Sequence, residues 1–242
     1  MALRRALALT LAIVLAAPAG ARELEEELVY TWRLDGFLGA VVGLFLPNHG
    51  EGLLTLERLG EGRRRGELLV TSRAEDTEDF FRYGAEWEVP SGRTLRAWSE
   101  QRWRGEEKSK EAEITDEDVI DVATAIFLLR KRPPQATQRL EIWSDGKLYP
   151  VRVEPRESEW RTFEGETVRV RHLAVRAEQI PGRRVWKGEL DLWLADDPEA
   201  TPVEILVARK AARVRLQLVG RRSGEPAGET PVSGDPGGRV AP

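Results

Sequence analysis

LDLWLADDPEATPVEI, residues Leu190–Ile205, is the stretch that decides the fold of this chain. Every second residue from Leu190 to Leu194 is apolar, and a period of two is typical of a β-strand with one buried face. The same alternation returns from Val203 to Val207. Because turn-forming residues separate the two runs, we predict a β-hairpin here.

The acidic pair Asp196-Asp197 lies between these two runs. A pair of carboxylates that does acid/base chemistry must face one cleft, whereas neighbours along a strand point to opposite faces. An Asp at the start of a turn accepts backbone hydrogen bonds, and Pro198 presets the next φ angle. We therefore predict that the pair shapes a turn.

Most of the remaining chain alternates in the same way. In the run from Val168 to Val175 the apolar positions change parity after Arg171, which indicates a bulge or a change of buried face. Gly, Pro, Asn and Asp separate the runs, as expected for hairpin loops. The strand candidates besides the opening hairpin are 28–34, 40–46, 52–59, 67–74, 86–90, 94–103, 140–143, 151–153, 168–175 and 214–218.

One segment, 115–134, has helical instead of strand periodicity. We predict that Thr115 is its N-cap and that the acids at 116–118 lie in its first turn, near the positive end of the helix dipole. Basic residues at 130–132 suit the other end, and Pro133-Pro134 stop the helix. A metal site at 116–118 is disfavoured because consecutive helical residues fan apart.

The fold class that follows is mainly β, an antiparallel curled sheet forming a barrel or half-barrel, with one short inserted helix. A sheet of about ten twisted strands tends to curl, which covers its edges. The helix would cover the open side or plug the mouth. With no long linker or internal repeat, residues 22–219 read as a single β-rich domain.

The two termini have other compositions. Residues 1–21 carry two arginines, an apolar run and Ala-Gly-Ala, a pattern typical of a signal peptide that is cleaved after about Ala21. The apolar run is too short to span a bilayer, although an uncleaved anchor is the alternative. We therefore predict a periplasmic protein. Residues 220–242, rich in Gly and Pro, are predicted to be a disordered tail, or alternatively a tether to a partner or cell wall.

Composition excludes several classes of function. The chain has no cysteine, so the exported protein must fold without disulfides. The 41 acidic residues outnumber the 37 basic ones, which argues against a nucleic-acid binder. No stretch of the mature chain is long and apolar enough for an integral membrane span.

Four stretches resemble an exported bacterial family called domain of unknown function 3108. The residues that carry the resemblance are 28–46, 118–133, 143–154 with its Asp-Gly-Lys hairpin, and 188–207 with Trp-Leu, Asp-Asp and Pro-Val. The sequence departs from the family's Pro-Ala-Gly turn at RTFEGETV. The resemblance covers about Glu23 to Val219, and it implies an exported, β-rich domain with no known reaction or ligand.

Catalytic and metal-binding patterns are scarce. The two histidines are His49, in an expected loop, and His172, which we interpret as a satisfied core residue near the change of face. Nucleophile elbows, phosphate-binding loops and zinc-ligand patterns are missing, so we predict no enzyme, no metal and no cofactor. Arg63, Arg64 and Arg65 are either a solvated hairpin tip or a contact for anionic lipid headgroups.

Eight tryptophans are more than a core of this size requires. Trp98, Trp143 and Trp193 lie opposite the aliphatic face of their strands, so they either pack or line a groove for an apolar ligand. We therefore expect an envelope protein that binds an apolar small molecule or lipid in its curled sheet. The alternative is a module that docks another envelope protein. A hydrolase ranks last.

Overall fold

The structure is a computed structural model, and it describes residues 22–34, 49–72, 79–103, 105–116, 118–163, 165–209 and 212–223. The predicted signal peptide, the strand candidate 40–46 and residues 224–242 of the predicted tail lie outside the described residues. β14 continues through Ser223, so the sheet extends past residue 219, where we placed the end of the domain.

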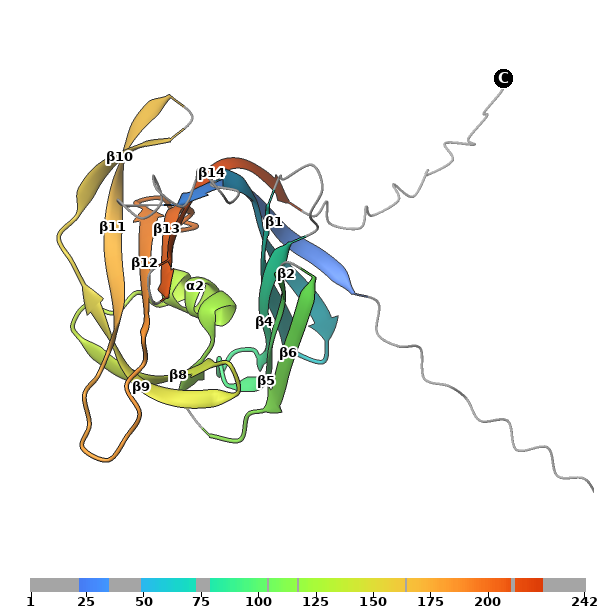
Figure 1. The fold of residues 1–242 in the computed structure, drawn as a ribbon. Coiled ribbons are helices and arrows are strands. Elements are labelled where there is room, and N and C mark those ends of the chain that lie inside the picture. Colours follow the sequence, from blue (N-terminus) through green and yellow to red (C-terminus); the bar gives the residue numbers. More distant parts are fainter. Residues whose placement is uncertain are drawn as a thin grey trace, which may run out of the picture.

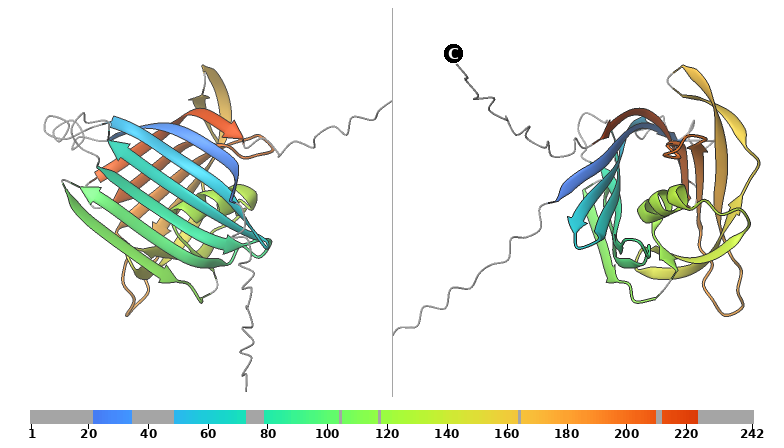
Figure 2. Two further views of the ribbon diagram at one scale, coloured as in Figure 1. Left: turned by 90° about the vertical axis from the view of Figure 1, so that its right-hand side faces the viewer. Right: turned by 180° about the vertical axis from the view of Figure 1, so that it is seen from behind.

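Within the described residues, one 14-stranded sheet curls around a single helix, α2 (Val122–Lys131), without closing into a barrel (Figures 1 and 2). The strands follow the order β6-β5-β4-β3-β2-β1-β14-β13-β12-β11-β9-β8-β7, and β10 pairs with β11 beside this path. All pairings are antiparallel except β7 with β8. The predicted fold class is thereby confirmed. The strands are β1 (Glu23–Leu34), β2 (His49–Gly60), β3 (Arg63–Ser72), β4 (Phe80–Glu88), β5 (Thr94–Trp103), β6 (Glu106–Glu113), β7 (Val119–Ile120), β8 (Gln138–Ser144), β9 (Lys147–Pro155), β10 (Glu159–Phe163), β11 (Glu166–Ala177), β12 (Gly188–Ala195), β13 (Pro202–Arg209) and β14 (Ala212–Ser223).

The alternating apolar residues form the concave face of the sheet, which packs on α2. Leu190, Leu192 and Leu194 are buried there together with Ile126 of the helix. The helix lies inside the curl of the sheet (Figure 1). Because these side chains pack together with the helix, the concave face is a packed core.

The change of parity in β11 is a change of buried face. β11 pairs with β12 from Val170 to Val175 without a register shift, so the strand contains no bulge there. Val170 is buried on the convex face in a separate cluster with Trp193, whereas Leu173 and Val175 face the core around α2. The convex face is therefore apolar in this region.

The helix begins later than the sequence predicted. Asp121, not Thr115, is the N-cap, and its side chain accepts hydrogen bonds from the backbone N–H groups of Ala123 and Thr124. The segment before it is β7, an extended pair of residues in which the carbonyl of Val119 accepts a hydrogen bond of 2.6 Å from the Thr94 hydroxyl. Burial raises the pKa of Asp121 above its ordinary value.

An ion pair inside the curl fixes α2 to the sheet. Arg130 binds both carboxylate oxygens of Glu26 in β1, with its Nη1 2.7 Å from Oε2. The same guanidinium donates to the backbone carbonyls of Glu199 and Ala200, in the turn between β12 and β13. The helix therefore also positions that turn.

Candidate binding site

The acidic pair of the opening stretch forms the turn between β12 and β13. Asp197 Oδ1 accepts hydrogen bonds from the backbone N–H of Glu199 at 2.8 Å and of Thr201 at 3.2 Å. Asp196 and Asp197 are both exposed. The predicted turn role is confirmed by these bonds.

Two adjoining hollows lie on either side of this turn. One has a volume of about 400 Å³ and the other about 470 Å³, and Phe163, Asp197 and Thr201 line both. The first is completed by Pro198, Glu199, Leu218 and Arg221, and the second by Glu166, Val168, Arg169, Ala195, Asp196 and Val203. The hollows therefore combine apolar walls with carboxylates and guanidinium groups at the rim.

Phe163 comes from β10, a short strand that pairs only with β11 and projects beyond the rest of the sheet (Figure 1). Phe163 and Val168 pack against the convex cluster formed by Val170, Trp193, Val203 and Leu206. Phe163, Val168 and Val203 therefore belong both to the wall of the second hollow and to this apolar cluster.

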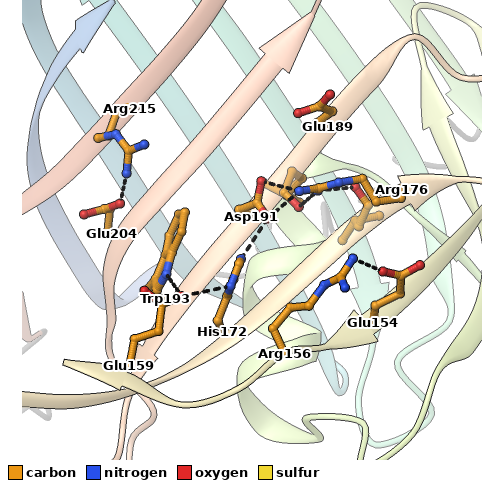
Figure 3. A network of polar contacts seen from close by, with 12 residues as sticks. Glu154, Arg156, Glu159, His172, Arg176, Glu189, Asp191, Trp193, Glu204 and Arg215 are labelled. Atoms are coloured by element: carbon orange, nitrogen blue, oxygen red, sulfur yellow. Dashed lines mark hydrogen bonds and ion pairs between the residues drawn. The ribbon is translucent and has the colours of Figure 1, made fainter. Parts of the chain in front are cut away.

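A network of charged and aromatic side chains continues from this cluster across the convex face (Figure 3). At its centre His172 stacks on Trp193, with ring centroids 4.5 Å apart and an angle of 12° between the planes. His172 Nε2 lies 2.8 Å from Asp191 Oδ1, and Nδ1 lies 3.2 Å from Glu159 Oε1. This satisfied environment fits the interpretation of His172 from sequence.

Asp191 is 3% exposed and remains a carboxylate because of its partners. Burial alone would raise its pKa, but hydrogen bonds from His172 and Arg176 outweigh burial and hold the pKa below its ordinary value. Arg176 Nη2 lies 2.7 and 2.8 Å from the two carboxylate oxygens. Asp191 therefore holds the side chains of His172 and Arg176 at once.

Arginines cover Trp193 from the solvent side. The guanidinium of Arg161 lies 5.2 Å from the ring centroid and that of Arg215 lies 5.6 Å from it. Glu204 forms ion pairs with both arginines. Trp193 is consequently only 5% exposed although it lies on the outer face.

The three tryptophans named from sequence lie in three different environments. Trp98 is on the convex face of β5, under Arg65 at 4.6 Å. Trp143 is buried with Ala97 and Ile114 in a separate cluster. The structure therefore does not bring the three together around one groove, and a role for them in ligand binding stays a prediction.

The basic spot Arg63, Arg64 and Arg65 begins β3, and each arginine is ion-paired with a neighbouring glutamate. These pairs leave little net charge for lipid headgroups. His49, expected in a loop, is the exposed first residue of β2, opposite Arg33 of β1.

Phe163 and Val203 are among the site residues that sequence reasoning missed. The parity change in β11 was a signal, because it showed that part of the convex face is apolar. These residues come together because β10 leaves the main path of the sheet and pairs with β11, beside the turn at 196–201. No local sequence pattern predicts this pairing of β10 with β11.

No family model and no curated protein matches the sequence. The resemblance to domain of unknown function 3108 therefore stays a prediction. Among solved structures, the chain is similar to a β-barrel-like protein of domain of unknown function DUF1849 from Brucella abortus, with 9% identity and a TM-score of 0.44 over 84% of this chain and 99% of that one. It is also similar to LprF from Mycobacterium bovis, with 12% identity and a TM-score of 0.31 over 85% and 88% of the two chains.

Two further properties bear on the site. Within the part of the chain that the structure describes, no three or more His, Asp or Glu side chains are grouped so that they could hold a metal ion. No helix among the same residues has the length and apolar character needed to cross a bilayer.

Proposed function

We propose that this chain is an exported, non-catalytic envelope protein that binds an apolar or amphiphilic molecule, such as a lipid, in the two hollows around Phe163. The observation that carries the proposal is the shared lining of these hollows, which puts an aromatic ring between two concave surfaces. Ligand sites in proteins are concave and mostly apolar, with a few polar groups that orient the ligand.

The chemistry of the lining supports an amphiphilic ligand. Val168, Val203 and Leu218 offer contacts for a hydrocarbon portion, while Arg169 at the rim of the second hollow suits a negatively charged or polar end. Arg221 in the first hollow is already ion-paired with Glu26 and Glu199. The proposal places the ligand at the end of the curled sheet instead of inside it, because α2 and the main cluster fill the concave face.

The state of His172 supports a non-catalytic role. A histidine that acts as a general base needs a free ring nitrogen within reach of the proton it removes. Both ring nitrogens of His172 face carboxylates, and the ring stacks on a buried tryptophan. The arrangement suits a structural clamp between β10, β11 and β12.

A titration with anilinonaphthalene sulfonate, an amphiphilic fluorescent probe, tests the site. We expect saturable binding to the mature protein, and the variant Phe163→Ala should weaken it about tenfold because the shared aromatic wall is lost. The matched control is Phe80→Ala, which removes a half-buried aromatic ring from β4, outside both hollows. Equal affinities for the two variants would contradict the site.

Native mass spectrometry of protein purified gently from the periplasm tests the natural ligand and the compartment together. We expect a bound lipid-like mass in the wild type that is reduced in Phe163→Ala. Repeated preparations that show only the bare protein mass would count against lipid binding even if the fluorescent probe binds.

A second candidate function, docking of another envelope protein, is favoured by one observation. Trp160 on β10 is 65% exposed, and among the strands that the structure describes β10 pairs with β11 alone. Exposed aromatic residues on a free strand edge suit strand addition by a partner. Loss of a periplasmic cross-link in Trp160→Ser, with probe binding intact, would favour this function over the first.

A further inference from the structure

The connection between β11 and β12, residues 178–187, projects beyond the sheet in all views of the molecule (Figures 1 and 2). Its tip exposes two large aliphatic side chains, Ile180 at 41% and Val185 at 44%. Pro181 between them is exposed as well. A large part of each of these two apolar side chains is therefore left in contact with solvent.

The tip is ordered. The backbone N–H of Arg183 donates a hydrogen bond of 3.1 Å to the carbonyl of Ile180, and Gly182 between them has φ of 78°. Proline followed by a residue with positive φ is the pattern of a type II turn. At the base of the connection, Trp186 is 8% exposed and packs over Gly188. The aliphatic tip is therefore held in place before any partner arrives.

Three basic residues accompany these aliphatic side chains. Arg183 is ion-paired with Glu141. Arg184 and Lys187 are exposed, and neither has an ion-pair partner among the residues that the structure describes. The contrast is with Arg64 and its neighbours in β3, which glutamates neutralise. The tip thus presents uncompensated positive charge next to exposed hydrocarbon.

We propose that this tip docks the protein on the surface of an anionic lipid bilayer. Aliphatic side chains beside Lys and Arg suit the boundary between headgroups and acyl chains, where the apolar groups enter and the cations meet lipid phosphates. The tip lies at the end of β12 that begins with Gly188, whereas the hollows lie at the other end, beside Ala195. The docking surface is therefore independent of the proposed ligand site.

A single labelled position tests insertion, since the chain contains no cysteine. The variant Ile180→Cys carries an environment-sensitive nitrobenzoxadiazole label. The control is Val219→Cys, whose position on β14 is 52% exposed and lies toward the other end of the sheet. With vesicles of phosphatidylcholine and phosphatidylglycerol we expect the emission to rise at position 180 and stay unchanged at 219. High salt should reverse the rise.

Charge variants test the electrostatic part. Arg184→Gln and Lys187→Gln should each weaken vesicle binding about fivefold at low salt. The control Arg64→Gln, which removes a neutralised cation, should leave it unchanged. Three results would overturn the proposal: no vesicle response at position 180, an equal response with pure phosphatidylcholine, or an equal response at position 219. A response at position 180 to a lipid-free protein extract alone would point to a protein partner and would also overturn it.

Discussion

Trp98 in β5 and Trp193 in β12 both lie on the convex face, and arginine side chains cover both of them. The two tryptophans differ in the residue that lies beneath the ring. Arg65 covers Trp98 at 4.6 Å, and Arg161 covers Trp193 at 5.2 Å. Directly across the neighbouring strand, Trp98 meets Gly84, whereas Trp193 meets His172.

The difference shows that a tryptophan covered by arginine can lie either on a glycine or on a side chain that has polar partners of its own. Beneath Trp98 the missing side chain of Gly84 leaves room for the indole ring. Beneath Trp193 a titratable ring fills the same place and connects to the carboxylates of Glu159 and Asp191. The first site is simple packing, while the second joins packing to a network of ion pairs and hydrogen bonds beside the proposed ligand site.

The largest expected change in the free energy of unfolding comes from removing one carboxylate at each of the two tryptophan sites. Asp191→Ala should lower the free energy of unfolding by about 3 kcal/mol, because Arg176 and His172 lose a shared, buried partner. Glu67→Ala removes a more exposed partner of Arg65 and should cost under about 1 kcal/mol. Urea unfolding monitored by tryptophan fluorescence measures both. Similar losses would show that the two sites are energetically alike.

The next effect tests the close contact between the indole ring of Trp98 and Gly84. In Gly84→Ala the new methyl group would collide with the indole ring, so we expect a loss of about 2 kcal/mol from overpacking. In a Trp98→Leu background the same change should cost less, and a double-mutant cycle measures that coupling. Gly220→Ala is the control, since the nearest atom to its added methyl group is 3.9 Å away. A loss at Gly220 as large as at Gly84 would refute the collision.

This comparison also shows what the sequence could predict. Alternation along β12, β13 and β14 was enough to predict which face of these strands is buried and that they belong to an antiparallel sheet, because burial on one face constrains every second residue. The Asp196-Asp197 turn followed from local hydrogen bonding alone. Such features depend on neighbours in the chain.

The remaining features depend on partners far away in the chain. The position of Trp193 opposite an aliphatic face left packing and a ligand groove as alternatives, and the sequence did not indicate that Arg215 from β14 and Arg161 from β10 cover this ring. The helix start was misplaced because Thr115 and Asp121 both suit an N-cap, and the contact between Val119 and Thr94 of β5 keeps the intervening segment extended. The residue pattern of one strand does not indicate which distant strand provides the side chains that cover its tryptophan.

A smaller effect concerns pH. Because the pKa of Asp191 is lowered by folding, the unfolded chain binds more protons there, and the stability that it contributes rises with pH. That contribution is present above the ordinary pKa of an aspartate, about 3.9, and is lost as the pH falls toward the lower folded value. Between pH 6 and pH 3 we expect a smaller stability loss in Asp191→Asn than in the wild type. Chemical unfolding at both pH values measures it, and parallel losses would contradict the assignment.

The smallest expected stability change tests the feature that the two sites share, an arginine guanidinium group over the indole ring. Arg161→Lys and Arg65→Lys both keep the positive charge but lose the planar guanidinium that lies over the indole, so each should cost about 0.5–1 kcal/mol. Arg139→Lys is the control, because Arg139 is 81% exposed and pairs with Glu178. We expect its unfolding midpoint in urea to match the wild type. If Arg161→Lys and Arg65→Lys also unfold at the wild-type midpoint, the positive charges paired with glutamates are enough to bury both tryptophans. The covering side chains then act in the same way at Trp98, which lies over glycine, and at Trp193, which lies over histidine.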